Sequence, residues 1–180
     1  MLISIRLVFN LRTQIKNWFS LRFSYQLIIA MFAACFALNA YAGEDLSITQ
    51  QTRLANAGNA NAQLMLGAMY SLGQGVRQDN AVARQWYEKA ANQGSANAQL
   101  VLGMMYEEGS GVRQDYAIAQ QWYEKAANQG NAFAQYNLGG MYGNGNGVRQ
   151  DYAVAKEFFG KACDNGHQKG CDAYKKLNTR

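Results

Sequence analysis

The heptapeptide GQGVRQD, residues 73–79, decides the fold because the chain repeats it. It returns as GSGVRQD at 109–115 and as GNGVRQD at 145–151, with a spacing of 36 residues both times. Its glycines suggest a phosphate-binding loop, but such a loop is a single feature that needs a third glycine or a Gly-Lys-Ser/Thr ending. Three evenly spaced copies indicate a repeat architecture instead.

Aligning the chain from Gly58 gives three units, 58–93, 94–129 and 130–165. The first two share 27 of their 36 residues, which fixes the register. In the first unit, apolar residues recur at helical spacing in both halves. They are Ala62, Leu66, Met69 and Tyr70, then Ala83, Trp86, Tyr87 and Ala90. This spacing predicts two amphipathic helices in each unit, and no segment suggests a strand.

The heptapeptide then has a structural role between the two helices. Gly73 and Gly75 are predicted to leave the first helix with positive φ, and Asp79 to cap the second. Asp115 and Asp151 repeat the capping role, while further glycines end each second helix. These glycines are Gly94, Gly130 and Gly166.

Small and aromatic residues recur where helices are expected to meet. Glycines stand inside the first helices at Gly67, Gly103 and Gly139, and alanines in the second at Ala83, Ala119 and Ala155. A glycine inside a helix costs about 1 kcal/mol relative to alanine, so close helix contact is the expected compensation. Trp86, Trp122 and Phe158 are predicted to fill the groove between neighbouring helices.

Residues 1–42 have the character of a cleaved signal peptide. Their only charges are basic, and the apolar run 27–38 is followed by Ala40, Tyr41 and Ala42. This order predicts cleavage after Ala42. A run of 12 apolar residues is short of the roughly 20 that span a bilayer, so no transmembrane anchor is expected after processing. Lipid attachment at Cys35 is the weaker alternative.

The mature chain carries almost no net charge. Loss of the leader leaves 13 basic and 12 acidic residues, so the excess of positive charge belongs to the leader. Without a basic surface the main driving force for nucleic-acid binding is missing, and no nucleic-acid partner is expected. We expect a monomer in the periplasm or secreted from the cell.

The mature chain keeps one pair of cysteines, Cys163 and Cys171, and one histidine, His167. In an oxidising compartment the pair is expected to form a disulfide, the alternatives being two free thiols or a metal pair. A metal site needs more ligands than these residues supply, so neither a metal nor a cofactor is expected. Residues 43–57 resemble a second helix without its aromatic pair and are predicted to be an N-terminal capping helix. Residues 166–180 are predicted to form the C-terminal capping helix.

The repeated positions together resemble the Sel-one-like repeat, a relative of the tetratricopeptide repeat, through residues 58–163. The matching positions in the first unit are Ala62, Leu66, Gly67, Tyr70, Gly73, Gly75, Val76, Asp79, Ala83, Trp86, Tyr87, Lys89, Ala90 and Ala91. The resemblance implies an all-α fold, a right-handed α/α superhelix or solenoid of three 36-residue helix-turn-helix repeats plus capping helices. It also implies a scaffold for protein–protein contacts. The spacing in CDNGHQKGC, 163–171, is similar to the disulfide spacing of cysteine-rich bacterial members, although this chain lacks a bridge in every repeat.

By analogy with tetratricopeptide repeats, residues of the first helices line a concave groove that binds a protein or peptide. The candidates are Asn61, Ala68, Asn97, Met104, Glu107, Phe133 and Tyr136. Phe133 is the strongest candidate, because asparagine stands there in the other units and an exposed aromatic ring is a common anchor. Leu64, Leu100 and Tyr136 can equally belong to the core. Drift at solvated positions is the alternative explanation for the variation. The row Arg77, Arg113 and Arg149 is a second candidate, for an acidic partner, although such residues more often pair at a solvated edge.

An enzyme is the alternative function, because cysteine-rich relatives are associated with β-lactam binding or hydrolysis. Acylation of a serine needs a base within reach, as in Ser-x-x-Lys. The mature serines Ser47, Ser71, Ser95 and Ser110 are followed three places on by Gln50, Gln74, Ala98 and Arg113. No catalytic residue is therefore predicted, and the expected function is non-catalytic binding.

Overall fold

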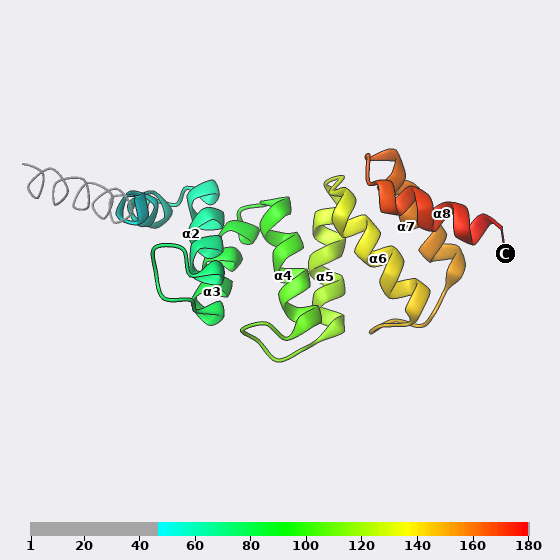
Figure 1. The fold of residues 1–180 in the computed structure, drawn as a ribbon, viewed down its shortest axis with the longest axis horizontal. Coiled ribbons are helices and arrows are strands. Elements are labelled where there is room, and N and C mark those ends of the chain that lie inside the picture. Colours follow the sequence, from blue (N-terminus) through cyan, green and yellow to red (C-terminus); the bar gives the residue numbers. More distant parts are fainter. Residues whose placement is uncertain (1–46, 180) are drawn as a thin grey trace, which may run out of the picture. The chain divides into compact units, whose positions relative to one another are not determined.

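The computed structural model describes residues 47–179, and the predicted leader lies outside this range. A helix over residues 47–56 is followed by three sequential helix pairs and a final helix, α8 (Figure 1). These helices are α2 (Ala60–Leu72), α3 (Asn80–Asn92), α4 (Ala96–Glu108), α5 (Tyr116–Asn128), α6 (Ala132–Asn144), α7 (Tyr152–Asp164) and α8 (Gln168–Asn178). The predicted all-α fold of three helix-turn-helix units is confirmed.

The repeated heptapeptide links the two helices of each pair, as the sequence predicts. Gly73 ends α2 in the left-handed region with a φ of 70°, and Gly75 has a φ of 68°. Asp79 caps α3, since its Oδ1 accepts hydrogen bonds from the backbone N–H groups of Ala81 and Val82. Asp115 caps α5 and Asp151 caps α7 in the same manner, so the second helix of each pair begins in the same way.

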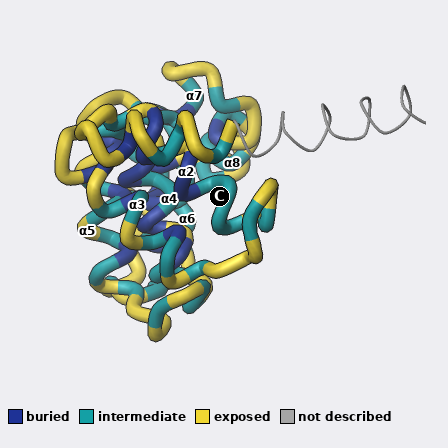
Figure 2. The backbone as a smooth tube through the Cα atoms, turned by 90° about the vertical axis from the view of Figure 1, so that its left-hand side faces the viewer, coloured by how far each residue is buried: buried dark blue, intermediate teal, exposed yellow. Residues whose placement is uncertain are grey.

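The core lies between consecutive helices, and exposed positions gather on the loops and outward faces (Figure 2). Inside each pair, a glycine of the first helix faces an aromatic ring of the second. A methyl group on Gly67 would lie 2.7 Å from the ring of Tyr87, and one on Gly103 would lie 2.4 Å from that of Tyr123. Only glycine permits this close approach. Close helix contact is therefore confirmed as the reason why glycine recurs at positions 67, 103 and 139.

The tryptophans fill a different position from these rings. Trp86 and Trp122 are half-buried, and each packs against the apolar cluster formed with the preceding unit. Lys89 Nζ lies 3.8 Å from the ring centroid of Trp86, and Lys125 Nζ lies 4.0 Å from that of Trp122. A cation over an aromatic face is stabilising, so the lysines cover the exposed sides of these rings.

Candidate functional site

The first helices share an exposed face that carries large apolar side chains. Met65 and Leu72 of α2 are 53% and 65% exposed, Met104 of α4 is 41% exposed, and Phe133 of α6 is 60% exposed. Met65 and Leu72 follow Asn61 by four and eleven residues, a spacing that puts all three on one side of the helix. We call the exposed positions of α2, α4 and α6 the first-helix face.

Four of the predicted binding residues lie openly on this face. Asn61 and Asn97 are exposed, as are Met104 and Phe133. Asn97 Oδ1 accepts a hydrogen bond of 3.3 Å from Asn131 Nδ2 in the next unit, while Ala68 is half-buried. Ala68 was predicted from the sequence as a binding residue and Met65 and Leu72 were not, although the positions i+4 and i+11 from Asn61 point to them.

Glu107 is engaged inside the protein instead of being free for a ligand. Its Oε2 accepts a hydrogen bond of 2.6 Å from the Tyr123 hydroxyl. Burial, followed by the neighbouring carboxylate of Glu107, raises the pKa of Tyr123 far above its ordinary value, so the phenol stays protonated. Leu64 and Leu100 are partly buried and pack against the core clusters, in agreement with the interpretation that they belong to the core.

Phe133 and Tyr136 both contact His167, which was not predicted from the sequence as a residue of the binding site. The ring centroids of His167 and Phe133 are 4.8 Å apart, with their planes nearly perpendicular. The centroids of His167 and Tyr136 are 4.6 Å apart. These rings line an open pocket of about 440 Å³, which we call the aromatic pocket. Its wall is completed by Ala132, Asn137, Asn165, Gly166, Gln168 and Lys169.

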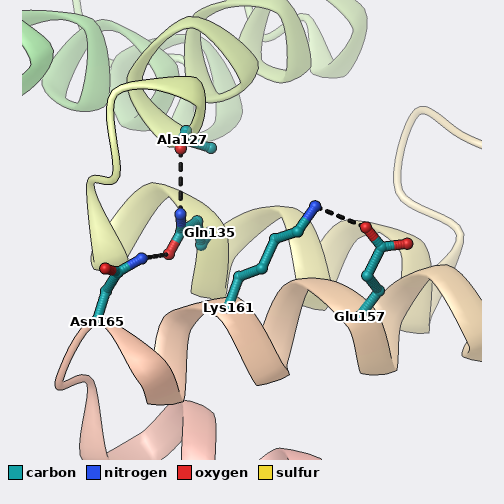
Figure 3. A network of polar contacts seen from close by, with 5 residues as sticks. All are labelled: Ala127, Gln135, Glu157, Lys161 and Asn165. Atoms are coloured by element: carbon teal, nitrogen blue, oxygen red, sulfur yellow. Dashed lines mark hydrogen bonds and ion pairs between the residues drawn. The ribbon is translucent and has the colours of Figure 1, made fainter.

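Three buried glutamines, which were not predicted from the sequence, join the units behind this face. Gln63, Gln99 and Gln135 are only 4–5% exposed. Gln135 Nε2 donates to the carbonyl of Ala127 at 3.1 Å, and its Oε1 accepts from Asn165 Nδ2 at 2.8 Å (Figure 3). Each such bridge therefore ties a first helix to the end of the preceding helix and to the end of its own partner.

The other two glutamines make the same bridges. Gln99 Nε2 donates to Ala91 O at 3.1 Å and its Oε1 accepts from Gln129. Gln63 Nε2 donates to Ala55 O at 3.0 Å and its Oε1 accepts from Gln93. A buried polar group without a partner is costly, and these bonds satisfy both the amides and the terminal carbonyls of helices.

In the last unit the same two positions hold a disulfide. Cys163 and Cys171 stand eight residues apart, the separation of the pair Ala127 and Gln135, and they are bonded with a Cα–Cα distance of 4.5 Å. The predicted disulfide is thus present, and it is consistent with an oxidising compartment. It fastens α8 to α7, where a methyl group on Gly170 would lie 2.8 Å from Ala162 Cβ.

The arginines of the repeated heptapeptide lie beside open pockets, one of about 620 Å³ lined by Arg113 and one of about 500 Å³ lined by Arg77. Arg77, Arg113 and Arg149 are exposed, and none of them forms an ion pair within residues 47–179. The described residues contain no group of three or more metal-ligating side chains. Among these same residues no helix has the length and apolar character to cross a membrane.

The family model of the Sel1 repeat matches residues 60–95, 96–131 and 132–167. The chain therefore belongs to the Sel1 repeat family, as its repeated positions indicated. These matched segments begin two residues after the units delimited from Gly58. No curated protein matches the chain.

Three solved structures are similar to this chain. The first is c5321, a protective antigen of uropathogenic Escherichia coli with an SLR fold, at 42% identity and a TM-score of 0.66 over 67% of this chain and 26% of the antigen. A Sel1 repeat protein from Oxalobacter formigenes is 34% identical, with a TM-score of 0.67 over 73% of this chain and 54% of that protein. Helicobacter pylori cysteine rich protein B is 25% identical, with a TM-score of 0.58 over 73% of this chain and 95% of that protein. The chain thus spans about a quarter and about half of the first two proteins.

Proposed function

We propose that this Sel1 repeat protein is an exported, non-catalytic scaffold that binds a protein or peptide through its first-helix face. The observation that carries the proposal is the distribution of exposed apolar side chains. Six large hydrophobic side chains are exposed within the described residues, and four of them, Met65, Leu72, Met104 and Phe133, belong to α2, α4 and α6. Large exposed apolar side chains gathered on one face are typical of interaction sites.

Phe133 is the proposed anchor of this surface. Its ring is 60% exposed and is held on one side by the edge contact with His167. A ring that is fixed before binding loses little conformational freedom when a ligand covers it. Met104, on the neighbouring first helix, supplies a flexible side chain that adapts to different apolar surfaces.

The disulfide and the predicted leader support export to the periplasm or beyond the cell. Catalysis is not expected, because no serine of the mature chain has a suitably spaced base and His167 Nδ1 is occupied by the Gly170 N–H. Turnover of the β-lactam nitrocefin by the purified protein would contradict this part of the proposal.

Site-specific photo-crosslinking tests the binding surface. A photoreactive phenylalanine analogue is placed at Phe133 or Met104, and at the exposed Gln85 of α3 as the matched control. Crosslinking to one defined protein from positions 133 and 104 but not from 85 supports the proposal. Recovery of the same proteins from all three positions would show that the first-helix face is not the binding surface.

A further inference from the structure

One wall of the aromatic pocket is made of a loop that the disulfide closes. Five of the nine lining residues, 165–169, lie between Cys163 and Cys171. The opposite wall, which includes Phe133 and Tyr136, belongs to α6. The pocket therefore exists only while the loop is held against the first helix of the third unit.

Backbone hydrogen bonds hold the loop to the end of α7, among them one of 2.8 Å from the His167 N–H to the carbonyl of Ala162, whereas its contacts with α6 are the two ring contacts of His167 and one side-chain hydrogen bond. His167 Nδ1 accepts a hydrogen bond of 3.1 Å from the backbone N–H of Gly170, so the ring caps the start of α8. Asn165 Nδ2 donates to Gln135 Oε1, and within residues 47–179 this is the hydrogen bond that joins the loop to α6. Gly170 is the single fully buried residue of α8, so this helix contributes little apolar burial of its own.

We propose that the disulfide is a redox switch for the aromatic pocket. The inference rests on the proposed function, because it concerns the surface on which Phe133 is the anchor. An external dithiol supplies two electrons and two protons, the S–S bond breaks to give the thiols of Cys163 and Cys171, and the dithiol becomes a disulfide. Release of the bond lets α8 and residues 165–169 move away from Phe133 and Tyr136.

The repeats are expected to remain stacked after reduction. Their own junctions depend on Gln63, Gln99 and Gln135, and a reductant does not act on hydrogen bonds between amides. The change is therefore local: the pocket opens at the C-terminal end, while the first-helix face of α2 and α4 is preserved.

The single histidine of the chain makes this change measurable by NMR. Its imidazole resonance is unambiguous, and contacts with two aromatic rings shift it and give NOEs to Phe133 and Tyr136. On addition of dithiothreitol to the purified protein, with the free thiols verified by mass, these NOEs are expected to vanish and the shift to approach that of a solvated histidine. The indole resonances of Trp86 and Trp122 are expected to stay in place.

Two variants control the experiment. Cys163→Ser with Cys171→Ser should give the reduced spectrum without reductant, while Gln99→Ala, which disturbs a junction one unit away, should leave the NOEs of His167 intact. Unchanged NOEs in the fully reduced protein would overturn the proposal. Collapse of the indole resonances together with that of His167 would overturn it too, since the response would be global unfolding.

Crosslinking from position 133 separates this inference from the proposed function. If the oxidised protein captures no defined partner, the proposed function fails, while the NMR result stands on its own. If oxidised and reduced proteins capture the partner equally although the NOEs have vanished, the pocket is not the redox-sensitive part of binding, and the inference fails.

Discussion

The junction of α5 with α6 and the junction of α7 with α8 use equivalent positions for different bonds. At the first, Gln135 reaches the carbonyl of Ala127 through its side-chain amide. At the second, Cys163 and Cys171 are covalently linked. An interior helix packs against helices on both sides and can rely on a buried hydrogen bond, whereas α8 packs mainly against α7, and Gly170 is its one fully buried residue.

The covalent link also requires a closer approach. Gly170 stands where the other units have a buried alanine, Ala134 in the third, and a methyl group on it would lie 2.8 Å from Ala162 Cβ. The change from amide bridge to disulfide therefore comes with a change from alanine to glycine one residue earlier. In α8 the position of the glycine that faces an aromatic ring in each pair is occupied by Lys175.

Loss of an interior bridge should have the largest effect on stability. Gln99→Ala removes a buried side chain together with its hydrogen bonds to the carbonyl of Ala91 and from Gln129 Nε2, so we expect a loss of about 3 kcal/mol in the free energy of unfolding. Urea unfolding followed by far-ultraviolet circular dichroism measures it. Gln121→Ala, at an exposed position of α5, is the control and should change stability by less than about 0.5 kcal/mol. Equal effects of the two substitutions would refute the role of the bridge.

Loss of the terminal link should cost slightly less. Cys163→Ser with Cys171→Ser frees a nine-residue loop, and the chain-entropy estimate gives a destabilisation of about 2.5 kcal/mol. Dithiothreitol should lower the urea midpoint of the wild type to that of the double variant and leave the variant itself unchanged. A further decrease in the variant would mean that the reductant acts elsewhere.

These differences show which parts of the molecule were predictable from sequence. Gly73, Gly75 and Asp79 were assigned correctly because their roles follow from local backbone chemistry. Gln135 was missed because a polar residue at a core position contradicts the apolar pattern, and its partner Asn165 lies 30 residues away.

The residues of the candidate site also fall into those that were predicted from the sequence and those that were missed. Phe133 and Met104 were named from their place in the repeat, and both are exposed. The contact of His167 with Phe133 and Tyr136 depends on how closely α8 packs, which one-dimensional spacing does not encode. Met65 and Leu72 were missed because the groove was delimited by analogy with another repeat instead of by the angle of each residue around the helix.

The glycines that face aromatic rings, Gly67, Gly103 and Gly139, occur in the helix pairs and have no counterpart in α8. Two adjacent glycines of α6, Gly139 and Gly140, test whether close helix contact is the reason for them. Gly139→Ala would put a methyl group 2.6 Å from the ring of Phe159, so a net loss of about 1–2 kcal/mol is expected after the gain in helix propensity. Gly140→Ala meets no atom within 4 Å and should stabilise the protein by about 0.5–1 kcal/mol. Thermal unfolding of both variants measures the difference, and opposite signs are the expected result.

A small net change is also expected when the disulfide of the α7–α8 junction is introduced at the equivalent positions of the α3–α4 junction. Ala91→Cys with Gln99→Cys places two thiols at the positions equivalent to 163 and 171, and Ala98→Gly supplies the glycine that accompanies them there. Because the new disulfide offsets most of the lost amide bridge while Ala98→Gly costs up to about 1 kcal/mol, stability should fall by only about 1–1.5 kcal/mol. Thiol titration under oxidising conditions should show complete bonding in this triple variant and incomplete bonding in the double variant that keeps Ala98. Complete bonding with Ala98 retained would show that the junction closes without the glycine, and that Gly170 serves some purpose other than the approach of α8 to α7.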